Sequence, residues 1–190
     1  MKRIILVGYM GSGKTTIGRQ LARNLGLEFY DLDWYIETRY HCTVAQIFAE
    51  RGEEGFREME RNMLHEVAEF ENIVLSCGGG TPCFYDNMDY LNEQGETVYL
   101  KATPQVLAKH LMMGRVERPL IKGKSEDELL EYIQTSLKTR EPFYSKAKHT
   151  LDVNLLDNHS KIQESVKLMC QLLDLPYTTE PKNKTSKYPY

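Results

Sequence analysis

The hydrophobic pattern at the start of the chain predicts a strand, a loop and a helix. The apolar run at residues 4–7 follows two basic residues and ends at Gly8, as expected for a buried parallel strand. Further along, apolar residues recur every four positions and stop at Gly26, a common helix terminator: Ile17, Leu21 and Leu25. A strand, a glycine-rich loop and a helix in this order are typical of the first unit of an α/β sheet.

Further short apolar runs predict more strands, each separated from the next by sequence of helical length, at residues 29–32, 73–77, 97–100 and 151–153. The segment between residues 29 and 73 is expected to be helical and to cover a pocket rather than to continue the sheet. Its apolar residues fall on two helical faces, Val44, Ile47 and Phe48 on one and Phe56, Met59, Met63, Val67 and Phe70 on the other.

Capping residues predict where two later helices begin. Thr103 precedes a proline, and Ser125 forms a capping box with Glu128. Between them, residues 112–124 contain two glycines, a proline and four basic residues, which is typical of a mobile loop. A last amphipathic helix is predicted from Ile162, Val166, Met169 and Leu173. The polar residues 177–190 are expected to form a disordered tail after a single domain at 1–176.

Composition excludes several classes of protein. The 190 residues are 41% hydrophobic and 27% charged, as in ordinary globular domains, and the net charge of −3 predicts neither a nucleic-acid nor a membrane partner. No window approaches the roughly 18 apolar residues of a membrane helix, and the N-terminus does not resemble a signal peptide. The four cysteines lack the spacing of a zinc site and are expected to be reduced core thiols of a cytoplasmic protein: Cys42, Cys77, Cys83 and Cys170.

Residues 8–15, GYMGSGKT, match the phosphate-binding pattern G-x-x-x-x-G-K-[ST] between a strand and a helix. The glycines let backbone N–H groups surround phosphate oxygens, Lys14 reaches the β- and γ-phosphates, and Thr15 offers a hydroxyl to Mg²⁺. A glycine-rich turn with an incidental lysine is the alternative. The predicted ATP-binding residues of this loop are Gly11, Ser12, Gly13, Lys14, Thr15 and Thr16.

Two further segments lie at predicted strand ends. Asp31 and Asp33 are spaced to share one face of an extended segment, so that one carboxylate approaches Mg²⁺ and Asp33 orients or deprotonates an acceptor hydroxyl. A turn or a helix cap is the alternative. The three glycines at 78–80 predict that another group closely approaches this backbone, or that it forms a flexible turn before Pro82.

Together these segments resemble the shikimate kinase family, over residues 2–173. The resemblance rests on Gly8 to Thr16 with Gly18-Arg19, Asp31-Leu32-Asp33, Ile36-Glu37, Gly52-Glu53, Phe56-Arg57 with Glu60, Gly78-Gly79-Gly80, Arg118-Pro119-Leu120 and Arg140-Glu141-Pro142-Phe143-Tyr144. It implies a nucleoside-monophosphate-kinase-like α/β fold: a five-stranded parallel sheet flanked by helices, with a substrate-binding helical region at about 33–62 and a lid at about 112–124. It also implies transfer of the γ-phosphate of ATP to the 3-hydroxyl of shikimate, on the route to chorismate and aromatic amino acids. We expect a monomer.

The resemblance also assigns roles to individual residues. Arg57 and Arg140 would hold the shikimate carboxylate, and Asp33 would bind its hydroxyls and serve the attacking one. Gly79 and Gly80 would line the same pocket, Asp31 would reach Mg²⁺ through water beside Thr15, and Arg118 would contact the phosphates. Taken alone, Arg57 would instead form a solvated ion pair with Glu60 or Glu54 on its own helix, and Arg140 would pair with Glu141 or Glu131.

The chain departs from the family pattern at two positions. Leu111 stands where the family often has an arginine that stacks on adenine, so apolar contacts or Lys109 are expected there. His41 occupies a turn where a glycine is common, and a left-handed backbone conformation is expected. Cys77 is either a reactive thiol or, more commonly for a strand cysteine, a buried one. A gluconate kinase and a non-catalytic nucleotide-binding module are the alternative functions.

Overall fold

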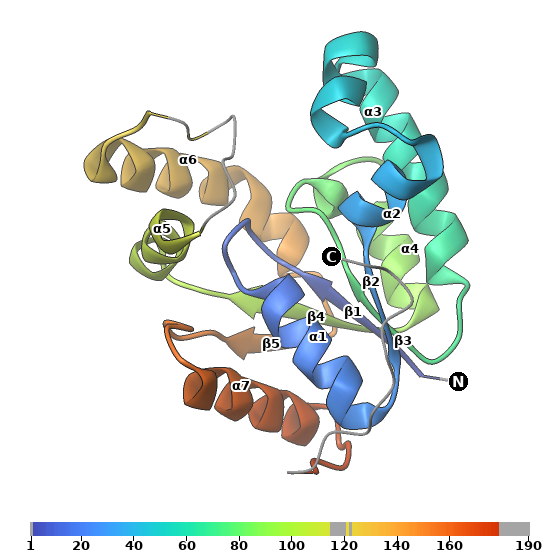
Figure 1. The fold of residues 1–190 in the computed structure, drawn as a ribbon, viewed down its shortest axis with the longest axis vertical. Helices are drawn as coiled ribbons and strands as arrows, with labels where there is room; N and C mark the ends of the chain where they lie inside the picture. The colour runs from blue at the N-terminus through green and yellow to red at the C-terminus, as the bar shows by residue number, and fades with distance from the viewer. Residues whose placement is uncertain (1, 115–120, 122, 179–190) are drawn as a thin grey trace.

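The computed structural model describes residues 2–114, 121 and 123–178 and contains a five-stranded sheet (Figure 1). All pairings are parallel and the strand order is β2-β3-β1-β4-β5. The strands are β1 (Arg3–Val7), β2 (Glu28–Asp31), β3 (Ile73–Ser76), β4 (Glu96–Lys101) and β5 (His149–Asp152). The predicted fold class and all five predicted strands are confirmed.

Strand β1 lies in the middle of the sheet. Ile5 is opposite Leu75 of β3 on one side and Thr97 of β4 on the other, and its side chain is fully buried. Such complete burial is expected of a parallel strand covered on both faces. From β1 the chain builds β2 and β3 on one side before it crosses to β4 and β5. Ligands of such sheets bind at the carboxyl ends of the strands where the order reverses, which here is the end of β1.

Helices cover both faces of the sheet (Figure 1). On one face α1 (Lys14–Leu25) contacts α7 (His159–Leu172), and α4 (Asn87–Gln94) lies on the other. Gly26 ends α1 in a left-handed conformation with φ 70°, as predicted. The predicted last helix is confirmed as well, although Leu173 is its C-cap rather than part of it.

The segment after β2 is helical, as predicted, and adds no strand to the sheet. It forms α2 (Leu32–Tyr40) and α3 (Val44–Ala68). His41 ends α2 with φ 54°, so the predicted left-handed conformation is confirmed. Gly52 has φ 68° and interrupts α3 with a kink. Figure 1 shows α3 on one side of the loop between β1 and α1, with α5 and α6 on the other.

The helices on that other side begin where the sequence predicts. Thr103 caps α5 (Pro104–Met113), and Ser125 and Glu128 form the capping box of α6 (Glu126–Tyr144). A short 3-10 helix, η1 (Thr81–Cys83), follows the three glycines. Much of the predicted lid at 112–124, including Arg118, lies outside the described residues.

Two residues of the predicted tail contact the folded domain. The hydroxyl of Tyr177 donates to Gln163 of α7 at 3.2 Å, and the backbone N–H of Thr178 donates to Asn24 of α1 at 3.3 Å. The expectation of a disordered tail from residue 177 is therefore wrong for these two residues, because both find polar partners on neighbouring helices. Residues 179–190 lie outside the described part. Within the described helices, no segment has the length and apolar character needed to span a membrane.

Candidate active site

The phosphate-binding loop depends on backbone conformations that favour glycine. Gly13 has φ 89° and caps the N-terminus of α1, and Gly8 has φ 141°. A Cβ at Gly8 would also lie 2.8 Å from the carbonyl oxygen of Leu100, closer than packed atoms allow. The turn between them directs the loop onto the N-terminus of α1, where unpaired N–H groups and the helix dipole favour an anion.

A cavity of about 390 Å³ opens beside this loop. Most of the predicted site residues line it: Gly11, Gly13, Lys14, Thr15, Thr16, Asp31, Asp33 and Gly79. Ser12 does not line it, because its side chain is completely buried inside the loop. The predicted phosphate and metal residues are therefore brought together at the carboxyl ends of β1, β2 and β3.

Lys14 is buried within the loop, with 8% of its surface exposed. Its ammonium group donates to the carbonyl oxygens of Gly8 at 2.8 Å and Tyr9 at 2.9 Å. These bonds hold a positive charge at the cavity wall, where it acts electrostatically on Asp31 and Asp33.

Asp31 and Thr15 form the part of the site suited to a metal ion. The Thr15 hydroxyl donates to Oδ2 of Asp31 at 2.8 Å. Burial raises the pKa of Asp31, and this outweighs the opposing effects of Thr15 and Lys14. A hydroxyl and a carboxylate in contact fit Mg²⁺, which proteins bind through one or two oxygen ligands together with substrate phosphates and water.

Asp33 lies in the first turn of α2 and not in an extended segment, so the prediction that it shares a strand face with Asp31 is wrong. The helix begins at Leu32, immediately after Asp31 has served as its N-cap residue. Both carboxylates nevertheless line the cavity. Burial raises the pKa of Asp33 to about 7, helped by the nearby charges of Asp31 and Glu60. A carboxylate with this pKa suits proton transfer at neutral pH.

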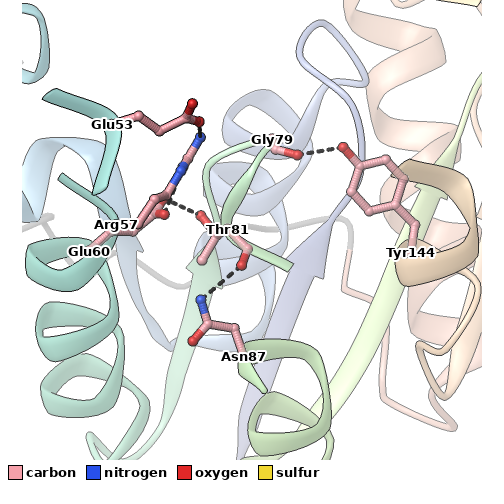
Figure 2. Close-up of polar contacts among 7 residues, drawn as sticks. All are labelled: Glu53, Arg57, Glu60, Gly79, Thr81, Asn87 and Tyr144. Atoms are coloured by element: carbon pink, nitrogen blue, oxygen red, sulfur yellow. Dashed lines mark hydrogen bonds and ion pairs between the residues drawn. The ribbon is translucent and has the colours of Figure 1, made fainter. Parts of the chain in front are cut away.

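The three glycines after β3 connect Asp33 to a second polar cluster. A Cβ at Gly78 would lie 2.9 Å from Oδ1 of Asp33, 3.0 Å from the Thr81 hydroxyl and 3.2 Å from Oε1 of Glu60. The Thr81 hydroxyl donates to Glu60 at 2.5 Å (Figure 2). Polar groups from α2, α3 and η1 therefore meet around a backbone that carries no side chains, as the glycine run predicts.

Arg57 belongs to this cluster and is not a solvated surface cation. Its guanidinium pairs with the buried Glu60 at 2.8 Å and with Glu53 at 3.3 Å, rather than with Glu54 (Figure 2). It also lies 4.0 Å from the ring centroid of Phe84. A Cβ at Gly80 would be 2.7 Å from Nη2 of Arg57, so the glycine turn leaves room for the guanidinium.

Arg140 approaches the same turn from α6. Its guanidinium lies 5.6 Å from the ring centroid of Tyr9, whereas Glu141, proposed as its alternative partner, pairs with Lys101 at 2.7 Å. Burial raises the pKa of the Cys83 thiol, and the charges of both Arg140 and Arg57 oppose this rise, so both cations act electrostatically on the same residue. Arg57, Gly80 and Arg140 lie next to the cavity and are not part of its lining.

The structure adds residues that the sequence did not predict. The Tyr144 hydroxyl donates to the carbonyl oxygen of Gly79 at 2.5 Å and so ties α6 to the glycine turn (Figure 2). Other cavity-lining residues outside the predicted site set are Met10, Ser76, Cys77, Gly78, His110, Met113, Gly114 and Leu156. Of these, Gly78 belongs to the predicted glycine run, and Met113 and Gly114 to the predicted lid. Contacts between residues so far apart along the chain leave no periodic signal in a single sequence. For Tyr144, the motif at 140–144 was the available clue.

The cysteines have different environments. Cys77 is 2% exposed, and burial raises the pKa of its thiol, so the reactive-thiol alternative is wrong. All four cysteines are free, but Cys42 and Cys83 are only partly buried, which corrects the expectation that all lie in the core.

Leu111 is buried and packs against the phosphate-binding loop. A Cβ at Gly11 would lie 3.0 Å from the Cγ atom of Leu111.

A phosphate-binding loop after the central strand of a parallel sheet, with two carboxylates beside it and the Arg57 cluster across a glycine turn, has the arrangement of a P-loop kinase. Comparisons with known proteins identify the family. The family model described as shikimate kinase matches residues 10–171. The chain belongs to the shikimate kinase family.

Individual relatives cover nearly the whole chain. This chain is 56% identical over 166 residues to a shikimate kinase of Phocaeicola vulgatus. The match covers 87% of this chain and 95% of that protein. The crystal structure of shikimate kinase from Bacteroides thetaiotaomicron matches with a TM-score of 0.89 and 52% identity, over 92% of this chain and 99% of the other. The structure of shikimate kinase from Acinetobacter baumannii in complex with shikimate matches with a TM-score of 0.77 and 35% identity, over 92% of this chain and 94% of the other.

Proposed function

We propose that this protein transfers the γ-phosphate of ATP to the 3-hydroxyl of shikimate and forms shikimate 3-phosphate, a step of aromatic amino acid biosynthesis. The carrying observation is the glycine turn 78–80, which has the Asp33 carboxylate at one end and the Arg57 guanidinium at the other. A base and a carboxylate-binding cation are thus held a short distance apart, which suits a small acceptor that carries both hydroxyls and a carboxylate.

Arg57 and Arg140 are proposed to hold the carboxylate of the acceptor, with Gly79 and Gly80 lining its pocket. A small polar anion offers little apolar surface, so its affinity depends on charge-assisted hydrogen bonds of about 1.5–3 kcal/mol each. The two cations come from different helices, and both act electrostatically on Cys83, close to the glycine turn. This arrangement favours shikimate over the uncharged hydroxyls of a simple polyol.

Asp33 is proposed to orient the attacking hydroxyl and to accept its proton. Its raised pKa lets the carboxylate take up a proton at neutral pH without being permanently protonated. The transfer breaks the bond between the γ-phosphorus and its bridging oxygen and forms a bond to the acceptor oxygen. The hydroxyl proton passes to Asp33, and ADP leaves.

The loop residues Gly11 to Thr16 are proposed to hold the phosphates, mainly through backbone N–H groups at the start of α1. For Lys14 to reach the β- and γ-phosphates, its ammonium group would exchange carbonyl partners for phosphate oxygens. Arg118 is proposed to contact the phosphates from the lid. Thr15, and Asp31 through water, are the residues suited to hold Mg²⁺, which neutralises phosphate charge when bound.

We also propose that the enzyme is a cytoplasmic monomer with no nucleic-acid or membrane partner, and that residues 1–176 form one kinase domain. Four free cysteines are common in reducing compartments.

The test is release of ADP from ATP and Mg²⁺ with shikimate, gluconate, quinate or no acceptor. Turnover with shikimate alone is the expected result. Turnover with gluconate instead would replace the proposal with a gluconate kinase. Nucleotide binding without turnover on any acceptor would identify a non-catalytic nucleotide-binding module.

A further inference from the structure

A histidine outside the predicted site joins two walls of the cavity. His110 lies in the last turn of α5 and lines the cavity together with Gly11 and Leu156. Its Nδ1 is 2.7 Å from the carbonyl oxygen of Gly11, and the backbone N–H of Leu156 donates to its Nε2 at 2.7 Å. One imidazole thus spans the phosphate-binding loop and a segment that follows it by more than a hundred residues.

The two partners fix the protonation of the ring. The carbonyl oxygen of Gly11 only accepts, so the Nδ1 that faces it carries a proton. The N–H of Leu156 only donates, so Nε2 is unprotonated. Both hydrogen bonds therefore require the neutral Nδ1–H tautomer, and each partner orients the ring for the other.

The hydrogen bond to Gly11 also orients part of the loop. The peptide between Gly11 and Ser12 is planar, so anchoring its carbonyl oxygen fixes the direction of the Ser12 N–H. That N–H donates to the carbonyl oxygen of Tyr9 at 3.1 Å, which closes the turn of the loop.

The hydrogen bond to Leu156 positions an apolar cavity wall. The Leu156 side chain lies so close to Gly13 that a Cβ there would overlap its Cδ1 atom. Leu156 and Met113 line the cavity on the side of α5, beside residues of the loop. Without the His110 acceptor, the Leu156 N–H would lose this hydrogen bond, and the segment that carries Leu156 would no longer be hydrogen-bonded to His110 of α5.

We propose that His110 is a positioning residue for the nucleotide, holding the phosphate-binding loop and the Leu156 wall in one fixed arrangement. This inference rests on the proposed function only in requiring that the cavity bind ATP or ADP. It does not depend on the identity of the acceptor. His110 would act through Gly11 and Leu156 rather than through contact with the reacting atoms.

Two amide variants separate its two hydrogen bonds. In His110→Asn the amide lies near the position of Nδ1, so it can bond Gly11 but does not reach Leu156. In His110→Gln the amide lies near the position of Nε2, so it can bond Leu156 but not Gly11. His110→Leu removes both bonds. His149→Gln is the matched control, because His149 begins β5 and pairs with Glu96, the first residue of β4, at 2.7 Å, at the end of the strands away from the cavity.

The first measurement is calorimetric titration of each folded variant with ADP in the presence of Mg²⁺, alongside its Tm. The loss of one neutral hydrogen bond predicts a rise in Kd of about 3- to 10-fold for the Asn and Gln variants. We expect a rise of about 10- to 100-fold for His110→Leu and no change for His149→Gln. In turnover assays the KM for ATP should rise in parallel, while the KM for shikimate stays within about twofold.

The alternative outcomes are distinct. Wild-type Kd values in all three folded His110 variants would overturn the inference, even if their Tm values fell, because His110 would then only stabilise the fold. A wild-type protein that binds no ADP would overturn both this inference and the proposed function. A wild-type protein that binds ADP but does not phosphorylate shikimate would overturn the acceptor assignment alone, and the ADP titrations would still decide the role of His110.

Discussion

The hydroxyl of Thr15, in the first turn of α1, donates to the carboxylate of Asp31 at the end of β2 over 2.8 Å. This contact joins the start of α1, which follows the phosphate-binding loop, to the end of β2 at the carboxyl edge of the sheet. It places the two oxygen ligands suited to Mg²⁺ side by side, beside the predicted position of the phosphates.

Thr15→Val, which keeps the shape of threonine and removes its hydroxyl, should reduce turnover about 10- to 100-fold and raise the Mg²⁺ concentration needed for half-maximal rate. The reason is loss of the hydroxyl proposed to bind Mg²⁺, together with its hydrogen bond to the Asp31 carboxylate, which is worth about 1.5–3 kcal/mol. Thr15→Ser keeps the hydroxyl and should stay near wild type. Titration of the rate with Mg²⁺ checks this, and an unchanged Mg²⁺ dependence in Thr15→Val would remove Thr15 from the metal site.

Asp33→Asn should lower kcat by about 10²- to 10⁴-fold, the usual contribution of a general base, and leave ADP binding intact. In the wild type only the ionised carboxylate accepts a proton. Since the pKa of Asp33 is raised to about 7, kcat/KM at low substrate should fall as the pH drops below about 7. Steady-state rates across pH 5–9 measure this. Asp89→Asn, which changes an exposed carboxylate paired with Lys146, is the control. Near-normal turnover in Asp33→Asn would exclude it from the mechanism.

The same group should make folding stability depend on pH. The pKa of Asp33 rises from an ordinary value of 3.8 to about 7 on folding, so between these values the folded protein binds more protons than the unfolded chain. The free energy of unfolding therefore falls as the pH rises from about 4 to 7, because the folded protein must give up the proton that it binds on Asp33. Asp33→Asn removes this cost, and its Tm at pH 8 should exceed that of wild type by at least about 2–4 °C, the shift that 1 kcal/mol produces at this size. The gap should shrink toward pH 4 in thermal melts; a constant gap would contradict the raised pKa.

Arg57→Lys should raise the KM for shikimate about 10- to 100-fold, with a much smaller effect on the KM for ATP. Lysine keeps the charge that balances the buried Glu60 but lacks the planar fork that binds a carboxylate at two points. Arg61→Lys is the matched control, because Arg61 lies one turn further along α3 and pairs with Asp86. A fall in kcat with an unchanged KM for shikimate would argue against ground-state carboxylate binding.

Gly80→Ala tests the room that the glycine turn leaves for the Arg57 guanidinium. The new methyl group would lie 2.7 Å from Nη2 in the present geometry, so the flexible end of Arg57 must move. We expect the protein to fold and the KM for shikimate to rise about tenfold, while the KM for ATP serves as the internal reference. If Gly80→Ala binds shikimate normally, Arg57 does not need its present position.

The glycine turn shows how far the sequence could predict the site. Three consecutive glycines predicted a close approach to the backbone, and the approaching groups are Asp33, Thr81, Glu60 and Arg57. The sequence also left open whether Arg57 was a solvated ion pair. The structure instead places it beside the buried Glu60, because α3 turns this face toward η1.

The sequence by itself determined the α/β class, the five strands, the helix caps and the phosphate-binding loop, because periodicity, capping and glycine chemistry act within a few residues. Only the tertiary structure decided that Asp33 lies in a helix beside Asp31. It also decided that Tyr144 ties α6 to Gly79, and that His110 joins Gly11 to Leu156. The contacts of Tyr144 and His110 join residues that are remote along the chain, and their geometry depends on how the sheet and its helices pack.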